Sequence, residues 1–244
     1  MEPYILRGVV VTDIVLGRGL YSSVVEVEYC GLKCAGKKIH DQGKSQIIQR
    51  FEEECQLLSQ LRHPNIVQFL GVYFPPGERV PILVMERLQT NLTSTIKLLG
   101  ILPKEIGYSI LHDVSLGLCY LHSQTPPIVH RDLSSNNVLL RSDMTAKISD
   151  LGISKILGPA QTNSMMHTHG TPAYMPPEIM KANPTYDISI DEFSYGILII
   201  HIFSGKWPEP LNPVDVALDG QLIPLSEAEP DAMSIFKSLE MTIH

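Results

Sequence analysis

The stretch "IVHRDLSSNNVLL", residues 128–140, places one acid and one amide between two apolar runs. The acid is Asp132 and the amide is Asn137, and His130 and Arg131 stand directly before the acid. No lysine or arginine follows Asp132 within this stretch. A polar segment of this composition between apolar runs predicts a functional loop. The motifs on either side of it indicate which chemistry the loop serves.

Two more motifs follow the loop, "AKISDLGISK" at 146–155 and "GTPAYMPPE" at 170–178. Before it come "LGRGLYSSV" at 16–24, then Lys37 on a strand-like run and Glu54 on a helix-like one. Taken singly these features are weak, because a glycine hairpin is more often a turn and an isolated Lys–Glu pair is more often solvated. In this order the set resembles the eukaryotic protein kinase signature, and the resemblance covers nearly the whole chain.

The resemblance implies a role for each charged or amide residue of these motifs. Asp132 matches the aspartate that orients the substrate hydroxyl and accepts its proton. Asn137 and Asp150 match the Mg²⁺ ligands, and Lys37 matches the lysine that contacts the ATP phosphates and pairs with Glu54. These roles suit the reaction, because phosphoryl transfer spreads negative charge over oxygen atoms and is catalysed mainly by positioning and by cations.

The resemblance also implies an ATP site formed by the glycine loop, by apolar residues above and below the adenine, and by backbone groups beyond Met85, which matches the gatekeeper. Glu86 and Leu88 would offer those backbone groups to the purine. Taken without the motifs, the apolar members would be ordinary core residues. The residues matched to the ATP site are Leu16, Gly17, Gly19, Val24, Ala35, Lys37, Met85, Glu86, Leu88 and Leu139.

The hydrophobic pattern predicts an α+β fold. Up to about residue 90, β-branched runs broken by glycine indicate an antiparallel sheet, and residues 45–61 form one amphipathic helix. Later segments are helical, including 191–203, which is apolar nearly all round and belongs in the middle of its lobe. We expect one kinase domain over 1–244, with an N-lobe at about 1–87, a C-lobe at about 88–244 and ATP in the cleft between them.

Composition narrows the partners and the compartment. The 244 residues carry a net charge of −7, which provides no basic field for nucleic acid. The longest apolar run, residues 196–203, is too short for a membrane segment, and the four cysteines contain no CxxC pair, which favours a cytoplasmic protein. We expect a protein substrate and an upstream kinase that acts on Thr162, Ser164 or Thr168 of the activation segment.

The chain departs from the family pattern at several positions. Ser22 replaces a loop glycine, Leu151 replaces a phenylalanine, and Gly36 loosens the strand that carries Lys37. The cation that kinases place soon after the catalytic aspartate is absent, since those positions hold Ser134 and Asn136. The chain also ends before the arginine that should pair with Glu178, so we expect a truncated C-lobe.

These features leave two functions open. The first is an active kinase of the tyrosine kinase-like group, with Ser/Thr specificity favoured by Thr171 and tyrosine specificity left open by the loop that lacks lysine. The second is a weakly active or inactive pseudokinase that binds nucleotide or acts as a scaffold. The five residues Lys37, Glu54, Asp132, Asn137 and Asp150 favour the active enzyme.

Overall fold

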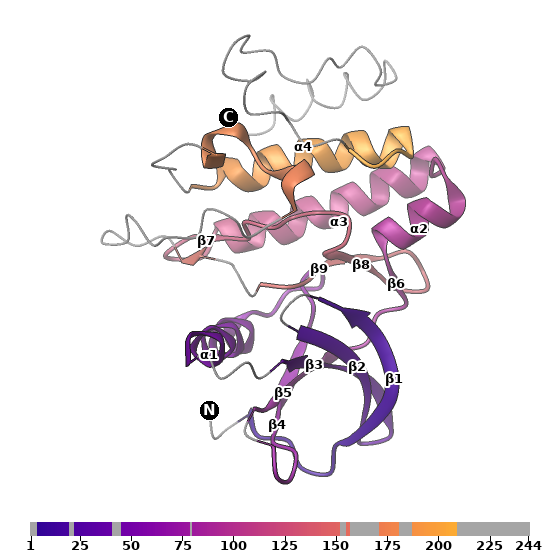
Figure 1. Cartoon of the computed structure of the whole chain (residues 1–244). Coiled ribbons are helices and arrows are strands. Elements are labelled where there is room, and N and C mark those ends of the chain that lie inside the picture. Colours follow the sequence, from indigo (N-terminus) through magenta and orange to yellow (C-terminus); the bar gives the residue numbers. More distant parts are fainter. Residues whose placement is uncertain are drawn as a thin grey trace. The chain divides into compact units, whose positions relative to one another are not determined.

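The protein is described from a computed structural model, which describes residues 4–19, 22–40, 45–78, 80–151, 155–156, 171–180 and 187–208, without the side chains of 45–50, 155–156, 178 and 180 (Figure 1). The chain divides into two compact units. The first comprises Met1–Gln89 and Ser149–Ile153, and the second comprises Thr90–Ile148 and Ser154–His244.

The first unit contains a five-stranded antiparallel sheet with strand order β1-β2-β3-β5-β4. The β2–β3 turn is Cys30–Gly31, and both residues have positive φ, of 50° and 77°. That combination is typical of a type I′ turn, whose twist matches that of the flanking strands. The strands are β1 (Val10–Arg18), β2 (Ser22–Tyr29), β3 (Leu32–Ile39), β4 (Phe69–Tyr73) and β5 (Ile82–Glu86).

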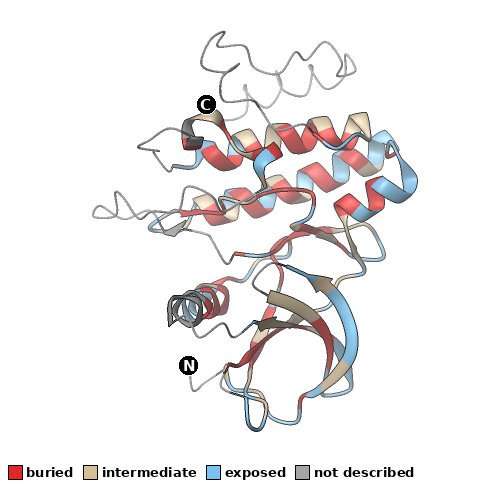
Figure 2. Cartoon of the chain, viewed as in Figure 1, coloured by how far each residue is buried: buried red, intermediate tan, exposed pale blue. Residues whose placement is uncertain are grey.

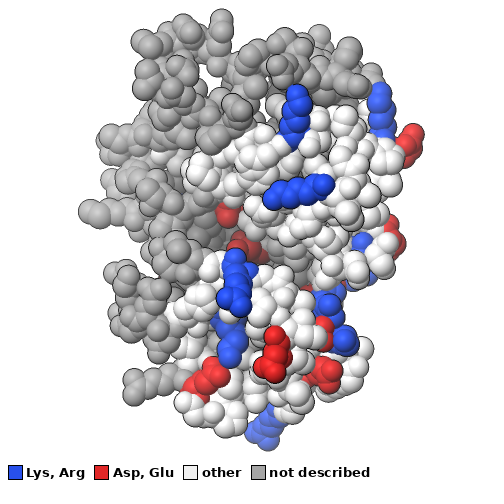
Figure 3. Space-filling view, turned by 45° about the vertical axis from the view of Figure 1, so that its right-hand side comes forward, with Lys and Arg blue, Asp and Glu red and all other residues white. Residues whose placement is uncertain are grey.

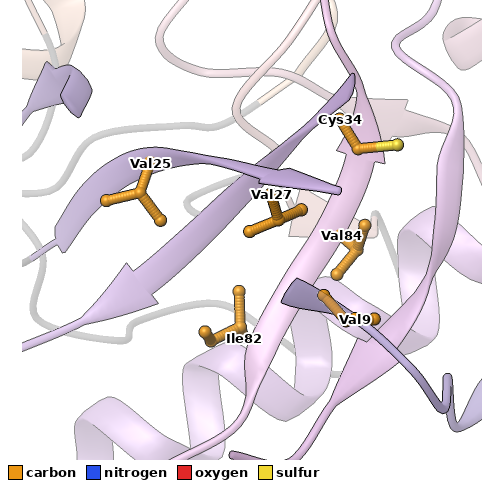
Figure 4. Packing of buried hydrophobic residues seen from close by; sticks show 6 residues of the cluster. All are labelled: Val9, Val25, Val27, Cys34, Ile82 and Val84. Atoms are coloured by element: carbon orange, nitrogen blue, oxygen red, sulfur yellow. The ribbon is translucent and has the colours of Figure 1, made fainter. Parts of the chain in front are cut away.

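The two faces of this sheet have different surroundings. One face carries a buried apolar cluster, whose side chains Figure 4 shows gathered together: Val9, Val25, Val27, Cys34, Ile82 and Val84. Helix α1 (Ser45–Gln60) contacts β4 and buries Phe51 and Leu58, as its amphipathic pattern predicts. Side chains alternate along a strand, so residues one position away from a cluster member lie on the opposite face. Lys37 is on that opposite face, because it pairs with Val24 and Leu83, the neighbours in sequence of Val25 and Val84.

Gly36 lies on the sheet face that carries the buried apolar cluster, and its neighbours there leave no room for a side chain. A Cβ atom built there would lie 2.6 Å from Cγ1 of Val27 and 2.9 Å from Cγ2 of Ile82. Both neighbours are buried and β-branched, so they cannot turn away freely. The absence of a side chain at Gly36 is therefore matched by closer packing of its neighbours.

We expect Gly36→Ala to lower the free energy of unfolding by about 1–3 kcal/mol, because the added methyl group overpacks this cluster. The midpoint of urea unfolding measures the change. Gly17→Ala is the matched control, since a Cβ atom there meets nothing within 4 Å. An unchanged midpoint for Gly36→Ala would show that the cluster can accommodate a methyl group without loss of stability.

The second unit is mostly helical. Asn91 caps α2, because its Oδ1 atom accepts a 2.7 Å hydrogen bond from the amide of Ser94. Helices α3 and α4 lie side by side in Figure 1 and contact each other. Its helices and strands are β6 (Thr90–Asn91), α2 (Leu92–Leu99), α3 (Lys104–His122), β7 (Ile128–Val129), β8 (Val138–Leu140), β9 (Ala146–Ile148), β10 (Lys155–Ile156), η2 (Pro172–Tyr174), η3 (Pro177–Met180) and α4 (Ser189–Ser204).

Helix α4 is largely buried, as its apolar pattern predicts. Figure 2 shows buried residues along most of its length, and only Glu192 is exposed between Ile190 and Ile202. Gly107 of α3 permits close packing, since a Cβ atom there would lie 3.0 Å from atoms of Ile202 and Phe203. The antiparallel sheet with one helix, together with the mostly helical second unit, confirms the predicted α+β fold.

Two surface properties of the described residues complete the fold. On the face shown in Figure 3, acidic and basic side chains are interspersed with uncharged ones. None of the described helices combines the length and the apolar character that crossing a membrane requires.

Candidate active site

Lys37 binds two other predicted site residues, Glu54 and Asp150. Its Nζ atom donates hydrogen bonds to Glu54 at 2.7 Å and 2.9 Å and to Oδ1 of Asp150 at 2.8 Å. The side chain of Glu54 is 5% exposed, that of Lys37 13% and that of Asp150 49%. The first unit therefore brings together a strand lysine, a buried helix carboxylate and an accessible carboxylate.

The charges of this group are interdependent. Burial by itself would lower the pKa of Lys37, but the carboxylates of Glu54 and Asp150 outweigh it and raise that pKa. Burial raises the pKa of Glu54, and the ammonium of Lys37 opposes that rise. Lys37 is therefore a cation at neutral pH, held in place by two carboxylates.

The glycine hairpin connects β1 and β2. The amide of Gly19 donates a 2.7 Å hydrogen bond to the carbonyl of Ser22, which closes the hairpin. Gly17 lies opposite Val24, and a Cβ atom at Gly17 would meet nothing within 4 Å. Leu16 is exposed. Open space beside a glycine backbone is what close approach of a ligand requires.

The apolar residues predicted for the ATP site stay outside the core. Ala35 pairs with Met85 and Val24 pairs with Lys37, so these residues share the sheet face opposite the buried cluster. They are partly exposed, as are Glu86, Leu88 and, in the second unit, Leu139. Partly exposed apolar side chains on the lysine face are free to contact an adenine, which core residues are not.

Asp132 is held by hydrogen bonds from two directions. Its Oδ1 atom accepts from the amide of Thr171 at 2.7 Å and from the Thr171 hydroxyl at 2.8 Å. Nδ2 of Asn137 donates to Oδ2 of Asp132 at 3.0 Å and to its carbonyl at 2.7 Å. The structure thus brings Asp132 and Asn137 together and adds Thr171, which the site prediction omitted although its motif was recognised.

The loop before Asp132 is anchored by a buried carboxylate on α4. Asp191 accepts hydrogen bonds from the amides of His130 at 2.8 Å and Arg131 at 2.9 Å, and a further bond of 2.8 Å joins it to Nε2 of His122. The contact between Asp191 and His122 was not predicted from the sequence. The backbone of Arg131 is in the left-handed region, with φ of 72°. This conformation is strained for a residue other than glycine, and it persists where the surrounding hydrogen bonds fix it.

A second buried hydrogen-bond network lies around His201. Its Nδ1 atom lies 2.7 Å from the hydroxyl of Tyr174, which donates to Oγ of Ser135 at 3.1 Å. Oγ of Ser135 also lies 2.6 Å from that of Thr93. Burial, with a smaller effect from the charge of Lys97, lowers the pKa of His201 to about 4. His201 is therefore neutral at pH 7.

We expect His201 to make stability fall on acidification. The unfolded chain binds this proton near pH 6.5, and the folded chain binds it only near pH 4. The stability from neutral His201 is thus present above pH 6.5 and lost between 6.5 and about 4, a loss of about 3 kcal/mol. Urea unfolding of the parent and of His201→Gln across this range measures it. Equal pH dependence in both would contradict the expectation.

Some expected features lie outside the described residues. Thr162, Ser164 and Thr168 are among them, and so is the side chain of Glu178.

Of the two expected Mg²⁺ ligands, Asn137 belongs to the second unit and Asp150 to the first. An amide oxygen and a carboxylate are nevertheless ligands of the kind that Mg²⁺ takes, and the exposed carboxylate of Asp150 is accessible to a cation.

A comparison with family models decides the class of protein. The model of the protein kinase domain matches residues 11–226. This chain belongs to the protein kinase family. The match includes every residue predicted for the ATP, metal and catalytic sites of the kinase domain, from Leu16 to Asp150.

Curated relatives agree with that assignment. The chain is 34% identical over 223 residues to the dual specificity protein kinase splA of Dictyostelium discoideum, covering 83% of this chain and 9% of the relative. It is 31% identical to the serine/threonine-protein kinase WNK2 of Mus musculus, with 80% and 9% covered. It is 32% identical to the serine/threonine-protein kinase CTR1 of Arabidopsis thaliana, with 82% and 25% covered. The chain thus spans a quarter or less of each of these relatives.

Proposed function

We propose that this kinase domain transfers the γ-phosphoryl group of ATP to serine or threonine hydroxyls of protein substrates. One observation carries the proposal. Asp132, which matches the aspartate that binds the substrate hydroxyl, is fixed by Asn137 and by Thr171 of the loop that resembles the substrate-binding loop of Ser/Thr kinases. Lys37, paired with Glu54, supplies the cation for the phosphates.

Each residue has one task in this mechanism. Asp132 orients the hydroxyl and accepts its proton, while Lys37 holds the phosphates and Glu54 holds Lys37. Asn137 and Asp150 would hold Mg²⁺, which neutralises charge on the phosphates when bound. Fixed charges of this kind need no reorganisation during the reaction, and that is the main source of catalysis in phosphoryl transfer.

Two observations favour serine and threonine over tyrosine. Two of the relatives described above are named serine/threonine-protein kinases, and one is named a dual specificity kinase. In addition, Thr171 binds Asp132 directly and lies 3.3 Å from the hydroxyl of Ser134. The residue that makes these contacts is thus a threonine, and it lies in the loop that resembles the substrate-binding loop of Ser/Thr kinases.

A radiometric assay tests the proposal. The chain is incubated with labelled ATP, Mg²⁺ and three peptides of one sequence that differ only in a central serine, threonine or tyrosine. We expect label on the serine and threonine peptides. Label on the tyrosine peptide alone would reverse the specificity, and no label on any peptide or generic protein substrate would favour the pseudokinase alternative.

The missing cation is the observation that favours the pseudokinase. Ser134 stands where Ser/Thr kinases carry lysine, and it is fully buried. Its hydroxyl contacts Thr171, so an uncharged group occupies this place beside Asp132. Loss of one preorganised donor typically costs about 100-fold to 1,000-fold in turnover, so we propose a slow enzyme.

We expect Ser134→Lys to raise turnover several-fold at saturating ATP with ATP affinity nearly unchanged, because the added charge acts mainly as the phosphoryl group moves. Initial rates against ATP concentration separate the two quantities. Asn136→Lys places a charge at the second of the two cation positions, which is exposed, and shows whether that position can act in place of Ser134. Turnover of Ser134→Lys at or below that of the parent would reject the role of the missing cation.

A further inference from the structure

Glu26 is a buried acid in the middle of β2, and its side chain is only 2% exposed. Its Oε2 atom accepts a hydrogen bond from Nη1 of Arg87, and its Oε1 atom lies 3.2 Å from Nζ of Lys33. A buried carboxylate is costly unless it is paired, so these two cations are what make it tolerable. Neither Glu26 nor Arg87 has a task in the mechanism above.

The register of the strands places this ion pair beside the predicted adenine residues. Glu26 pairs with Ala35, and Ala35 pairs with Met85. The next pair on the same face, toward the glycine hairpin, is Val24 with Lys37. Because alternate residues share a face, Glu26 lies on the face that carries Lys37 and Ala35. The buried apolar cluster, with Val25 and Val27, occupies the opposite face.

Arg87 stands between Glu86 and Leu88, the two residues whose backbone groups are expected to meet the purine. It directly follows β5, where the ladder with β3 has ended at Glu86. Its side chain therefore ties this segment across β3 to Glu26 on β2. The side chain of Arg87 is 35% exposed, and its Nη1 atom binds the buried carboxylate of Glu26.

The other side of the segment is tied to the chain before β4. The amide of Glu86 donates to the carbonyl of Gln68 at 3.0 Å, and the amide of Gln68 donates to Oε1 of Glu86 at 2.8 Å. Residues 86 and 87 are thus held from two sides, by one backbone hydrogen bond and by the side chains of Glu86 and Arg87. A segment that is already ordered loses less conformational entropy when it binds a ligand.

We infer that Glu26 and Arg87 are positioning residues that fix the backbone of residues 86–88 for a purine. The inference rests on the nucleotide binding in the proposed function and extends it to two residues outside the kinase motifs. Lys33 is 60% exposed and reaches the same carboxylate without holding the segment after β5. It provides a matched control, since its removal weakens the charge balance of Glu26 and leaves Arg87 bound.

Calorimetric titration with adenosine and with ATP tests the inference without requiring phosphoryl transfer. We expect the Kd of both ligands to rise about tenfold in Glu26→Gln and in Arg87→Gln, because the segment must then be ordered on binding. The Kd of the double variant should be no higher than that of the single variant that binds more weakly, because both changes break the same ion pair. Lys33→Gln should stay within about twofold of the parent, as exposed ion pairs contribute little.

Further variants separate positioning from loss of structure. Circular dichroism identifies any variant that does not fold, and Arg87→Lys then serves as the milder change, because it keeps the charge and loses the fork of the guanidinium. We expect an intermediate Kd for Arg87→Lys. An equal loss for adenosine and ATP points to the purine, whereas a loss for ATP alone would place the effect at Lys37.

Four results would overturn the inference: parent-like adenosine binding by folded Arg87→Gln or Arg87→Lys, an equal loss in Lys33→Gln, a loss confined to ATP, or a parent that binds no adenosine. Failure of the proposed function looks different. A parent that binds adenosine and ATP but labels no substrate removes the kinase activity, while the effect of Arg87→Gln on adenosine binding still supports the inference.

Discussion

Asp132→Asn is expected to lower phosphate transfer by about 100-fold to 10,000-fold, with ATP binding retained. The amide keeps the shape of the carboxylate, and its oxygen can still accept the two hydrogen bonds from Thr171. It cannot accept the proton of the substrate hydroxyl. Labelled phosphate incorporation measures the rate, and calorimetric titration with ATP measures binding.

Asp143→Asn is the control for this variant. Asp143 lies in the exposed turn between β8 and β9, where its carboxylate accepts a hydrogen bond from the amide of Thr145. It carries the same charge and lies outside the candidate site. If Asp132→Asn turned over as fast as the parent, Asp132 would not be the base, and the proposed mechanism would fail.

Lys37→Met is expected to lower turnover by about 100-fold to 1,000-fold, the usual cost of removing one preorganised charge-stabilising group. It also leaves Glu54 buried without its ammonium partner, so the pKa of Glu54 should rise further. Two effects are therefore mixed in this variant, namely lost chemistry and a destabilised fold. Initial rates and urea unfolding report them separately.

Two further variants resolve that mixture. Lys37→Met combined with Glu54→Gln removes the unpaired carboxylate, so stability should return toward that of the parent while activity stays low. Lys38→Met is the neighbouring control. Among the ion pairs of the described residues, Lys38 pairs only with the exposed Glu78, at 3.3 Å. Equal losses of turnover in Lys37→Met and Lys38→Met would contradict a special role for Lys37.

The sequence predicted the local structure well where the apolar residues follow the spacing of a single strand or helix. The β-branched runs indicated the strands of the first unit, and the helix at 45–61 is α1, Ser45–Gln60. The apolar segment at 191–203 is a buried helix, Ser189–Ser204. These predictions succeed because the face that a residue presents is set by backbone geometry, and the apolar pattern records which face is covered.

The identities of the candidate site residues were also readable, because each stands in a motif of fixed spacing. Their partners were less so. Thr171, His122 and His201 make buried or partly buried hydrogen bonds that no spacing predicts, since each joins residues from different elements. Only the motif around Thr171 pointed to one of these residues, and it did not predict that Thr171 contacts Asp132.

The sequence by itself determined the kinase family, the α+β class and the charged residues of the candidate site. The resemblance implied that Lys37 pairs with Glu54, and the tertiary structure alone decided that Asp150, 113 positions away, binds the same ammonium group. It also decided that Gly36 has no room for a side chain and that Glu26 is paired with Arg87. The physical reason is that burial and charge pairing depend on which strands become neighbours, and chain order does not record those distances.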